Sequence, residues 1–209
     1  MTATQKIAHS HPVDPQDRAR ADFYGLLARL FYAPADAGLL ALLAGSGELA
    51  AEDVRGALPE AWSALRHAAA ETTDEATRSE HEAIFVGVGK PVVMLYASFY
   101  LAGFLNEKPL AELRGDLAAL GFARSRAASE PEDHIAGLAD VMRQLILDEG
   151  RDAAERDAAQ QRFYSRHIEP WYSSLCDAVE AAPQADFYRS VAAFARAFLD
   201  IEKAFFRIG

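Results

Sequence analysis

The chain has 209 residues, of which 51% are hydrophobic and 25% are charged. This balance is typical of a globular protein with a buried core, and the length fits one large domain or two small ones. The net charge of −10 and the lack of a basic run exclude the electrostatic footprint of a nucleic-acid-binding protein. The same charge disfavours an anionic membrane surface, and no apolar stretch approaches the roughly 20 residues of a membrane span.

Cysteine content and the N-terminus suggest where the protein works. Cys176 is the only cysteine, so no internal disulfide forms, and no Cys/His cluster has zinc spacing. Residues 1–10 lack the apolar stretch of a secretory signal. We therefore expect a soluble, cytoplasmic protein that has no metal or other cofactor and is not inserted into a membrane.

The first third of the chain predicts helices. Residues 1–15 are polar and contain two prolines, which predicts a flexible N-terminal tail. Apolar residues then recur at helical spacing from Phe23 to Phe31, and Pro34 ends that helix. Residues 36–82 predict short helices with breaks near 45–47 and Pro59, followed by a further helix over 76–86.

The central segment departs from this pattern. Residues 86–97 contain two glycines and a proline within six residues, so we predict an extended loop packed on helices. Residues 92–96 could form a short strand, but nothing nearby in the sequence offers a partner. A helix is predicted over about 98–105. Pro109 opens the next helix, which Gly121 ends.

The second half predicts a helical bundle. Residues 129–132 have capping-box spacing, which predicts a helix that starts there, ends at Gly150 and buries the stripe 135, 138, 142 and 145. Helices over 152–167 and 170–181 follow. The last helix has the clearest pattern, with apolar residues at Phe187, Val191, Phe194, Phe198, Ile201 and Phe205. Without a strand pair or hairpin signal, the prediction is an all-α, single-domain multi-helix bundle over 16–209.

The sequence lacks the common catalytic motifs. There is no Glu-x-x-His di-iron motif, no His-Glu-x-x-His zinc site and no Gly-x-Ser-x-Gly elbow. The segment Gly87-x-Gly89-Lys90 lacks the strand and the ending of a phosphate loop, so a helix C-cap followed by a turn is the better interpretation. Cys176 is expected to be a small buried thiol rather than a nucleophile. A non-enzymatic protein is predicted.

The segment Glu130-Pro131-x-Asp133-His134 admits two interpretations. Helix initiation, favoured by the residues alone, explains the acids and the proline. A functional interpretation places Asp133 and His134 at an exposed helix start, where a carboxylate can pair with an arginine. Residues 48–82 hold nine acids and three bases, as do residues 129–157. If these two segments met, they would form an acidic patch; two solvated helix faces would explain them equally well.

The order of motifs resembles the TorD/DmsD/NarJ family of redox-enzyme maturation chaperones, in its TorD-like branch. The resemblance covers roughly residues 20–205. It rests on these segments: Phe23-Tyr24-x-x-Leu27-x-x-Leu30-Phe31; Ile84-Phe85-Val86-Gly87-x-Gly89-x-Pro91; Tyr96-x-Ser98-x-Tyr100; Glu130-Pro131-x-Asp133-His134, leading into Leu138-x-x-x-Met142-x-x-Leu145; Phe163-x-x-x-His167-x-x-x-Trp171; Phe187-Tyr188; and Phe198-x-x-x-Glu202.

The resemblance implies an all-α chaperone that binds the twin-arginine signal peptide or the apo catalytic subunit of a molybdopterin-containing oxidoreductase. Such a chaperone assists cofactor insertion and proofreads the enzyme before export, as a monomer or homodimer. The resemblance also implies the peptide-binding residues: Asp133, His134, Glu130 and Pro131, beside Gly87, Gly89, Pro91, Tyr96, Ser98 and Tyr100. In the central loop this chain departs from the family. The family usually has Gly-Pro-Gly where this chain has Val88 between the glycines, and it usually has a glutamate where this chain has Ala97.

Two alternatives remain open. The first keeps the fold and changes the client to a cytoplasmic molybdoenzyme, such as a formate dehydrogenase, that has no exported leader. The second is a small helical enzyme or sensor whose site the motifs do not reveal. Turnover or a stoichiometric metal in the purified protein would support the second.

Overall fold

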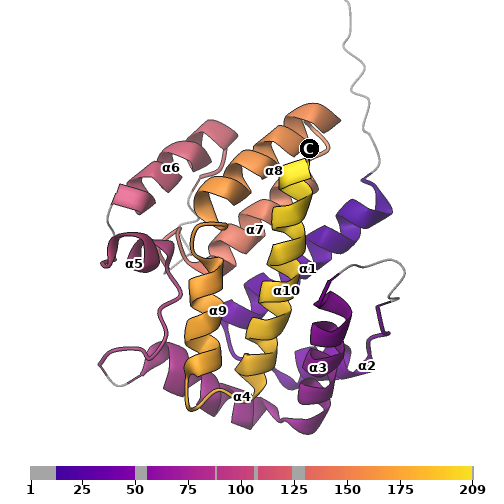
Figure 1. Ribbon diagram of the computed structural model, residues 1–209, viewed down its shortest axis with the longest axis vertical. Helices are drawn as coiled ribbons and strands as arrows, with labels where there is room; N and C mark the ends of the chain where they lie inside the picture. The colour runs from indigo at the N-terminus through magenta and orange to yellow at the C-terminus, as the bar shows by residue number, and fades with distance from the viewer. Residues whose placement is uncertain (1–12, 50–55, 88, 106–107, 124–129, 209) are drawn as a thin grey trace, which may run out of the picture.

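The computed structural model describes residues 13–49, 56–87, 89–105, 108–123 and 130–208. The predicted tail over residues 1–15 lies mostly outside this part, and α1 already begins at Pro15, with Asp14 as its N-cap. Helices follow one another along the described chain (Figure 1). They are α1 (Pro15–Tyr32), α2 (Ala37–Gly45), α3 (Leu58–Glu71), α4 (Asp74–His81), the π-helix η1 (Glu82–Val86), α5 (Ala97–Ala102), α6 (Lys108–Leu120), α7 (Ile135–Ile146), α8 (Ala153–His167), α9 (Tyr172–Ala181) and α10 (Phe187–Ile208).

The all-α fold class is therefore confirmed. The described residues contain no strand longer than one isolated bridge, between Tyr96 and His134. No helix in the same ranges is long and apolar enough to cross a bilayer.

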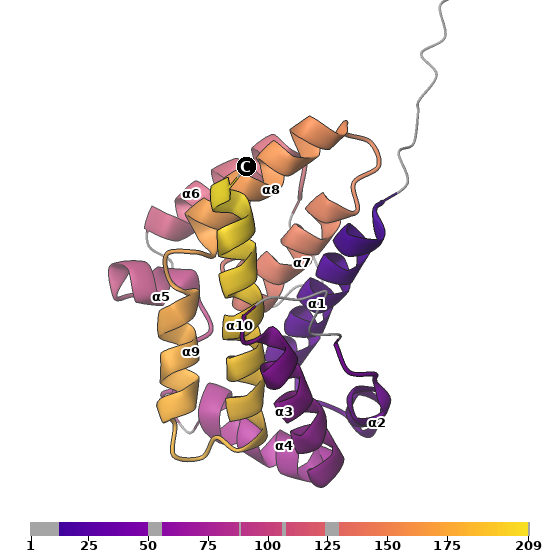
Figure 2. The same cartoon turned by 45° about the vertical axis from the view of Figure 1, so that its right-hand side comes forward.

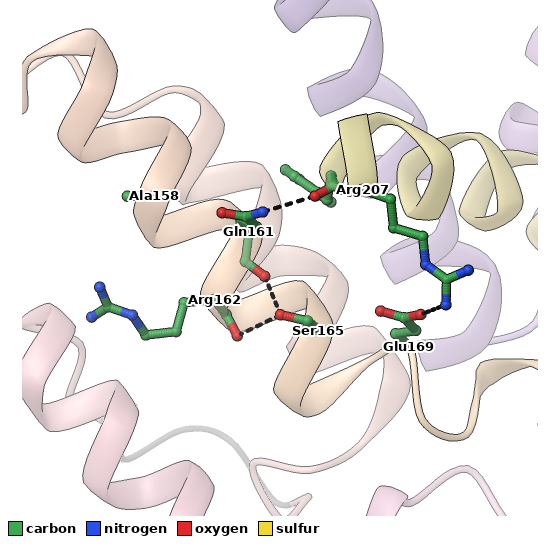
Figure 3. A pocket seen from close by; sticks show the side chains of 7 residues that line it. Ala158, Gln161, Arg162, Ser165, Glu169 and Arg207 are labelled. Atoms are coloured by element: carbon green, nitrogen blue, oxygen red, sulfur yellow. Dashed lines mark hydrogen bonds and ion pairs between the residues drawn. The ribbon is translucent and has the colours of Figure 1, made fainter. Parts of the chain in front are cut away.

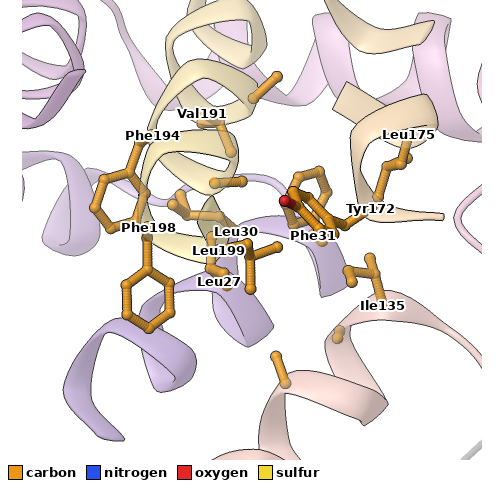
Figure 4. Packing of buried hydrophobic residues seen from close by; sticks show 14 of the residues in the cluster. Leu27, Leu30, Phe31, Ile135, Tyr172, Leu175, Val191, Phe194, Phe198 and Leu199 are labelled. Carbon is orange, nitrogen blue, oxygen red and sulfur yellow. The ribbon is translucent and has the colours of Figure 1, made fainter. Parts of the chain in front are cut away.

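Helix α10 is the centre of the bundle, and α3, α4, α9 and α1 pack around it (Figures 1 and 2). Its predicted stripe is buried from Phe187 to Phe198, whereas Ile201 is half-buried and Phe205 is 43% exposed. Figure 4 shows Phe194 and Phe198 together with Leu27 and Leu30 of α1 among the residues of the buried core. A long apolar face of this kind stabilises a helix mainly through the area it buries.

Two carboxylates hold α10 from opposite ends. At its start, the backbone N–H groups of Asp186, Phe187 and Tyr188 donate to the Glu80 carboxylate over 2.7–3.1 Å, which places a negative charge at the positive end of the helix. Near its other end, Glu202 is 1% exposed and accepts from the guanidinium of Arg20 on α1. These contacts join segments that are far apart in the sequence.

The segment 95–97 pairs with 133–135, a partner that the sequence did not indicate. The Ala97 N–H donates to the Asp133 carbonyl over 3.0 Å, and the Ile135 N–H donates to the Leu95 carbonyl over 2.9 Å. The prediction of an extended loop over residues 86–97 is confirmed, apart from the single bridge between Tyr96 and His134. The partner lies almost 40 residues downstream, where local pattern analysis cannot find it.

Two helix boundaries differ from the prediction. Helix α5 ends at Ala102, because Gly103 adopts a left-handed φ of +80°. Helix α7 begins at Ile135 with His134 as its N-cap, rather than in the capping-box segment, of which Ser129 lies outside the described residues. The backbone of 133–135 pairs with 95–97, which keeps Asp133 and His134 out of the helix.

Candidate functional site

The glycines of the central loop have conformational roles. Gly87 ends η1 with a φ of +62°, and a Cβ there would lie 2.8 Å from the Lys90 carbonyl oxygen. Only glycine fits this turn without a backbone shift. The C-cap interpretation of Gly87 is thus confirmed. The Val93 N–H donates to the Ile84 carbonyl over 3.0 Å, which returns the chain towards the bundle.

Asp133 is buried, which corrects the expectation that it lies at an exposed helix start. Asp133 is 1% exposed. Its Oδ2 accepts a hydrogen bond from the backbone N–H of Ser98 over 2.9 Å. Asp133 therefore supplies an acceptor for the first turn of α5. Its Oδ1 and the Ser98 hydroxyl have no hydrogen-bond partner among the described residues.

His134 is also buried, at 6% exposure, and it acts as the N-cap of α7. Its Nδ1 accepts from the Ala136 N–H over 3.1 Å, which requires a neutral ring. The Tyr96 ring packs edge-on against it at 5.2 Å between centroids. Burial lowers the pKa of His134 to about 4, although the nearby Glu130 and Asp133 carboxylates oppose that shift.

This pKa predicts a loss of stability in mild acid. Between pH 6.5 and about 4 the unfolded state binds a proton on His134 that the folded state does not, so the free energy of unfolding falls as the pH falls. From pH 7.5 to pH 5 this residue should cost about 2 kcal/mol. His134→Asn keeps a capping acceptor but does not titrate, so chemical denaturation at both pH values should show a smaller fall for the variant. Equal falls would contradict the assignment.

Asp133 and His134 line different cavities. Asp133 lines a cavity of about 230 Å³ that also contacts α5, α6 and α8. His134 lines a larger groove of about 780 Å³. The two neighbours point to opposite sides of their extended segment, as successive residues of a strand do. The structure therefore does not unite them in one site.

The larger space, here called the α1–α6–α7 groove, has a volume of about 780 Å³. Its walls are mainly apolar and aromatic, and its charged groups are three carboxylates and two guanidiniums. The lining residues are Ala28, Arg29, Tyr32, Arg114, Leu117, Phe122, Ala123, Glu130, Pro131, Glu132, His134, Ala136, Gly137, Asp140, Val141 and Gln144.

The charges of the groove are arranged by local contacts. Arg114 on α6 forms a two-pronged ion pair with Glu132, with nitrogen–oxygen distances of 2.9–3.2 Å. Asp140 on α7 accepts from the Gln144 amide over 2.7 Å. The Tyr96 hydroxyl donates to the Glu130 carboxylate. A groove of this composition can hold an apolar segment and still contact a cationic group at its rim.

The remaining predicted site residues do not line this groove. The segment 87–100 contributes no residue to the lining, and it contains Gly87, Gly89, Pro91, Ser98 and Tyr100. Tyr100 donates its hydroxyl to the Met94 carbonyl over 2.9 Å and stacks on Trp171.

Sequence reasoning missed the residues that α1 and α6 bring to the groove, such as Arg29, Tyr32 and Arg114. In the sequence these residues lie on the polar faces of their helices, which are typical of solvent-exposed surface. One signal was present, because Tyr32 is a large aromatic residue just before the predicted end of its helix, and it is 58% exposed.

The acidic patch that residues 48–82 and 129–157 would form if they met has no support from the main helix contacts of their described parts. Helices α3 and α4 pack on α10, whereas α7 packs on α1 and α8. Helix α1 packs extensively on α7 and also contacts α10. The acids of 129–157 that reach the groove are Glu130, Glu132 and Asp140.

Two other features offer no comparable site. Figure 3 shows a depression of about 280 Å³ between α8 and the end of α10, in which Gln161 donates to the Phe206 carbonyl and Arg207 pairs with Glu169. Its polar groups are largely satisfied by one another. Cys176 is buried, which raises the pKa of its thiol to about 12, and the prediction of an inert thiol is confirmed.

Comparison with known proteins gives consistent matches. A family model described as nitrate reductase delta subunit matches residues 51–177. Curated relatives named chaperone protein TorD include one from Photobacterium profundum, 29% identical over 129 residues, and one from Vibrio parahaemolyticus, 26% identical over 129 residues. Each match covers 58% of this chain, and the chain spans about 60% of the length of each relative.

A solved structure has the same fold over nearly the whole chain. It is described as a redox enzyme maturation protein from Archaeoglobus fulgidus, and the TM-score is 0.54 at 18% identity. The match covers 96% of this chain and 99% of that one. These findings agree with the resemblance drawn from the ordered motifs, and the relatives' names agree with the prediction of a chaperone rather than an enzyme.

Proposed function

Because the chain belongs to the nitrate reductase delta subunit family, with curated relatives named TorD chaperones, we propose that it is a maturation chaperone for a molybdopterin-containing oxidoreductase. In this proposal it binds the twin-arginine signal peptide of the apo catalytic subunit in the cytoplasm. It holds that subunit until cofactor insertion is complete and the enzyme can be exported.

The observation that best supports this proposal is the α1–α6–α7 groove. A signal peptide brings two arginines followed by an apolar stretch, and the groove offers apolar walls with the carboxylates of Glu130, Glu132 and Asp140 among them. Charge-assisted hydrogen bonds from a guanidinium to a carboxylate are stronger than hydrogen bonds between neutral groups. Peptide binding and release need no catalytic group.

The proposed site residues then fall into two groups. Glu130, Pro131 and His134 line the groove and are proposed to contact the peptide. Asp133 and Ser98 hold the 133–135 segment against α5, so we propose that they act by positioning that segment. Tyr96 bridges the groups, because it contacts both Glu130 and His134. Gly87, Gly89, Pro91 and Tyr100 are proposed to shape the loop behind them.

A matched pair of charge reversals tests the proposal. Asp140→Lys places a positive charge in the groove, whereas Asp157→Lys makes the same change on an exposed part of α8 that lines none of the cavities described above. Loss of a charge-assisted contact should weaken binding about tenfold to a hundredfold. We expect calorimetric titration with a client signal peptide to show that loss for Asp140→Lys alone.

Salt provides a second readout of the same titration. Wild-type affinity should fall as salt is added, because the arginine contacts lie at a solvent-exposed rim. Equal affinities for the wild type and both variants would show that the α1–α6–α7 groove does not bind the signal peptide. Binding to a catalytic subunit whose gene encodes no leader would instead favour the maturation of a cytoplasmic enzyme.

A further inference from the structure

A second groove continues from the first. It has a volume of about 470 Å³ and is called here the α1–α2 groove. Its lining residues are Asp22, Phe23, Gly25, Leu26, Ala28, Arg29, Leu39, Leu42, Leu43, Trp62, Asp140 and Arg143. Ala28, Arg29 and Asp140 line both grooves, so the two spaces meet across the line where α1 and α7 pack together.

The α1 residues at this junction include two with small side chains. Ala28 is part of the shared floor, and Gly25 stands on the same helix within the α1–α2 groove. A Cβ at Gly25 would lie 3.1 Å from Arg143 Cδ, so a larger residue would displace the Arg143 side chain that crosses α1 there. A bound chain that runs along α1 from one groove to the other would therefore contact Arg29, Asp140 and Arg143.

The composition of α2 indicates that its outer face is normally covered. All nine residues from Ala37 to Gly45 are Ala, Gly or Leu, so no charged or hydrogen-bonding side chain lies on the helix. A helix that is apolar all round is usually buried. Here Leu39, Leu40 and Leu43 are buried, but Leu42 is 59% exposed and lines the α1–α2 groove.

The two grooves differ in charge. In the α1–α2 groove, the carboxylates of Asp22 and Asp140 are matched by the guanidiniums of Arg29 and Arg143. The remaining lining is apolar or glycine. In the α1–α6–α7 groove, by contrast, carboxylates outnumber guanidiniums by three to two. The acidic part suits the cationic end of a peptide, and the balanced, apolar part suits an uncharged segment.

We infer that the α1–α2 groove binds the apolar segment of the same signal peptide whose arginines contact the α1–α6–α7 groove. This inference rests on the proposed function. Along α1, the two grooves together span Asp22 to Tyr32, about 15 Å of helix. About five residues of extended peptide, or about ten in a helix, would cover that distance.

The experiment uses two peptides and a matched pair of variants. One peptide carries the paired arginines and the apolar segment, and the other has that segment replaced by glycine and serine at equal length. Leu42→Glu alters the α1–α2 groove, whereas Phe104→Glu makes a similar change at a 72% exposed residue outside both grooves. Leu42→Ser serves as a milder variant, and melting curves check that each protein folds.

We expect Leu42→Glu to weaken binding of the apolar peptide about tenfold or more, the loss associated with one buried leucine side chain. Binding of the glycine-serine peptide should not change, and Phe104→Glu should leave both affinities as in the wild type. Unchanged binding to Leu42→Glu, with Asp140→Lys still impaired, would overturn this inference and leave the proposed function standing.

Two other outcomes have distinct meanings. If the wild type binds neither peptide, the proposed function fails and this inference fails with it. If sedimentation shows a wild-type dimer that Leu42→Glu converts to a monomer with normal peptide affinity, a second copy of the chain covers α2, and the inference is wrong.

Discussion

Phe198→Ala should lower the free energy of unfolding by roughly 3–5 kcal/mol. The Phe198 side chain is 1% exposed and makes edge-on contacts with Tyr24 at 4.9 Å and Phe23 at 5.4 Å between centroids. Through these contacts Phe198 joins α10 to α1. Figure 4 shows its position in the buried core. Removing the ring forfeits the burial of a large apolar surface and leaves a cavity in a well-packed region.

Phe205→Ala is the matched control. It makes the same substitution on the same helix, two predicted core positions further on, but Phe205 is 43% exposed. Its ring lies 4.5 Å from the Arg20 guanidinium, a contact worth about 0.5–1 kcal/mol at an exposed site. Denaturant titration should therefore show a much larger change in midpoint for Phe198→Ala. Similar changes would mean that the end of α10 is also covered, for example by a partner.

Glu202→Gln should cost roughly 3–5 kcal/mol, because it removes one partner of a buried ion pair. The Glu202 carboxylate accepts from Arg20 Nε over 2.7 Å and from Nη2 over 2.8 Å, and the Tyr24 hydroxyl donates to it over 3.0 Å. The variant keeps the shape of the side chain but leaves Arg20 with Asp17 as its remaining carboxylate. The melting temperature should fall by roughly 6–20 °C for a chain of this size.

Two further variants separate pairing from burial. Arg207→Ala removes the partner of a surface ion pair with Glu169 and should change stability by less than about 1 kcal/mol. Replacing both Arg20 and Glu202 by apolar residues should restore much of the loss, because a buried pair is often no more stable than apolar packing. If the double variant is as unstable as Glu202→Gln, the cost comes from packing and not from an unpaired charge.

The helices could be predicted because their apolar stripes record which face is buried. The stripe of α7 is an example, since Ile135, Leu138, Met142 and Leu145 are all buried as expected. The start of α7 could not be predicted. Pro131 and the acids around it give a strong local capping signal, but long-range pairing with residues 95–97 holds the backbone extended until His134.

The site was harder to predict than the fold. The motif Asp133-His134 was identified from the sequence, yet its two side chains point into different cavities, and the alternation follows from a pairing that the sequence did not indicate. The groove depends on how α1, α6 and α7 cross. Gly137 permits the segment before α7 to fold closely onto that helix, because a Cβ there would lie 3.2 Å from the Glu132 carbonyl oxygen.

Glu202 illustrates a motif residue whose role only packing explains. It was part of the ordered set of motifs, without an assigned function. In the fold it is the carboxylate that joins α10 to α1, the helix that forms the floor of both grooves. Its contribution to peptide binding is therefore expected to be indirect, through the position of α1.

Photo-crosslinking maps the proposed peptide site most directly. A client signal peptide would carry a benzophenone side chain next to its arginines, and mass spectrometry would identify the residues to which it becomes attached. The account predicts attachment within the α1–α6–α7 groove, at residues such as Tyr32, Leu117 and Val141. Attachment instead to the exposed apolar residues around Phe104, or to the depression between α8 and α10, would contradict it.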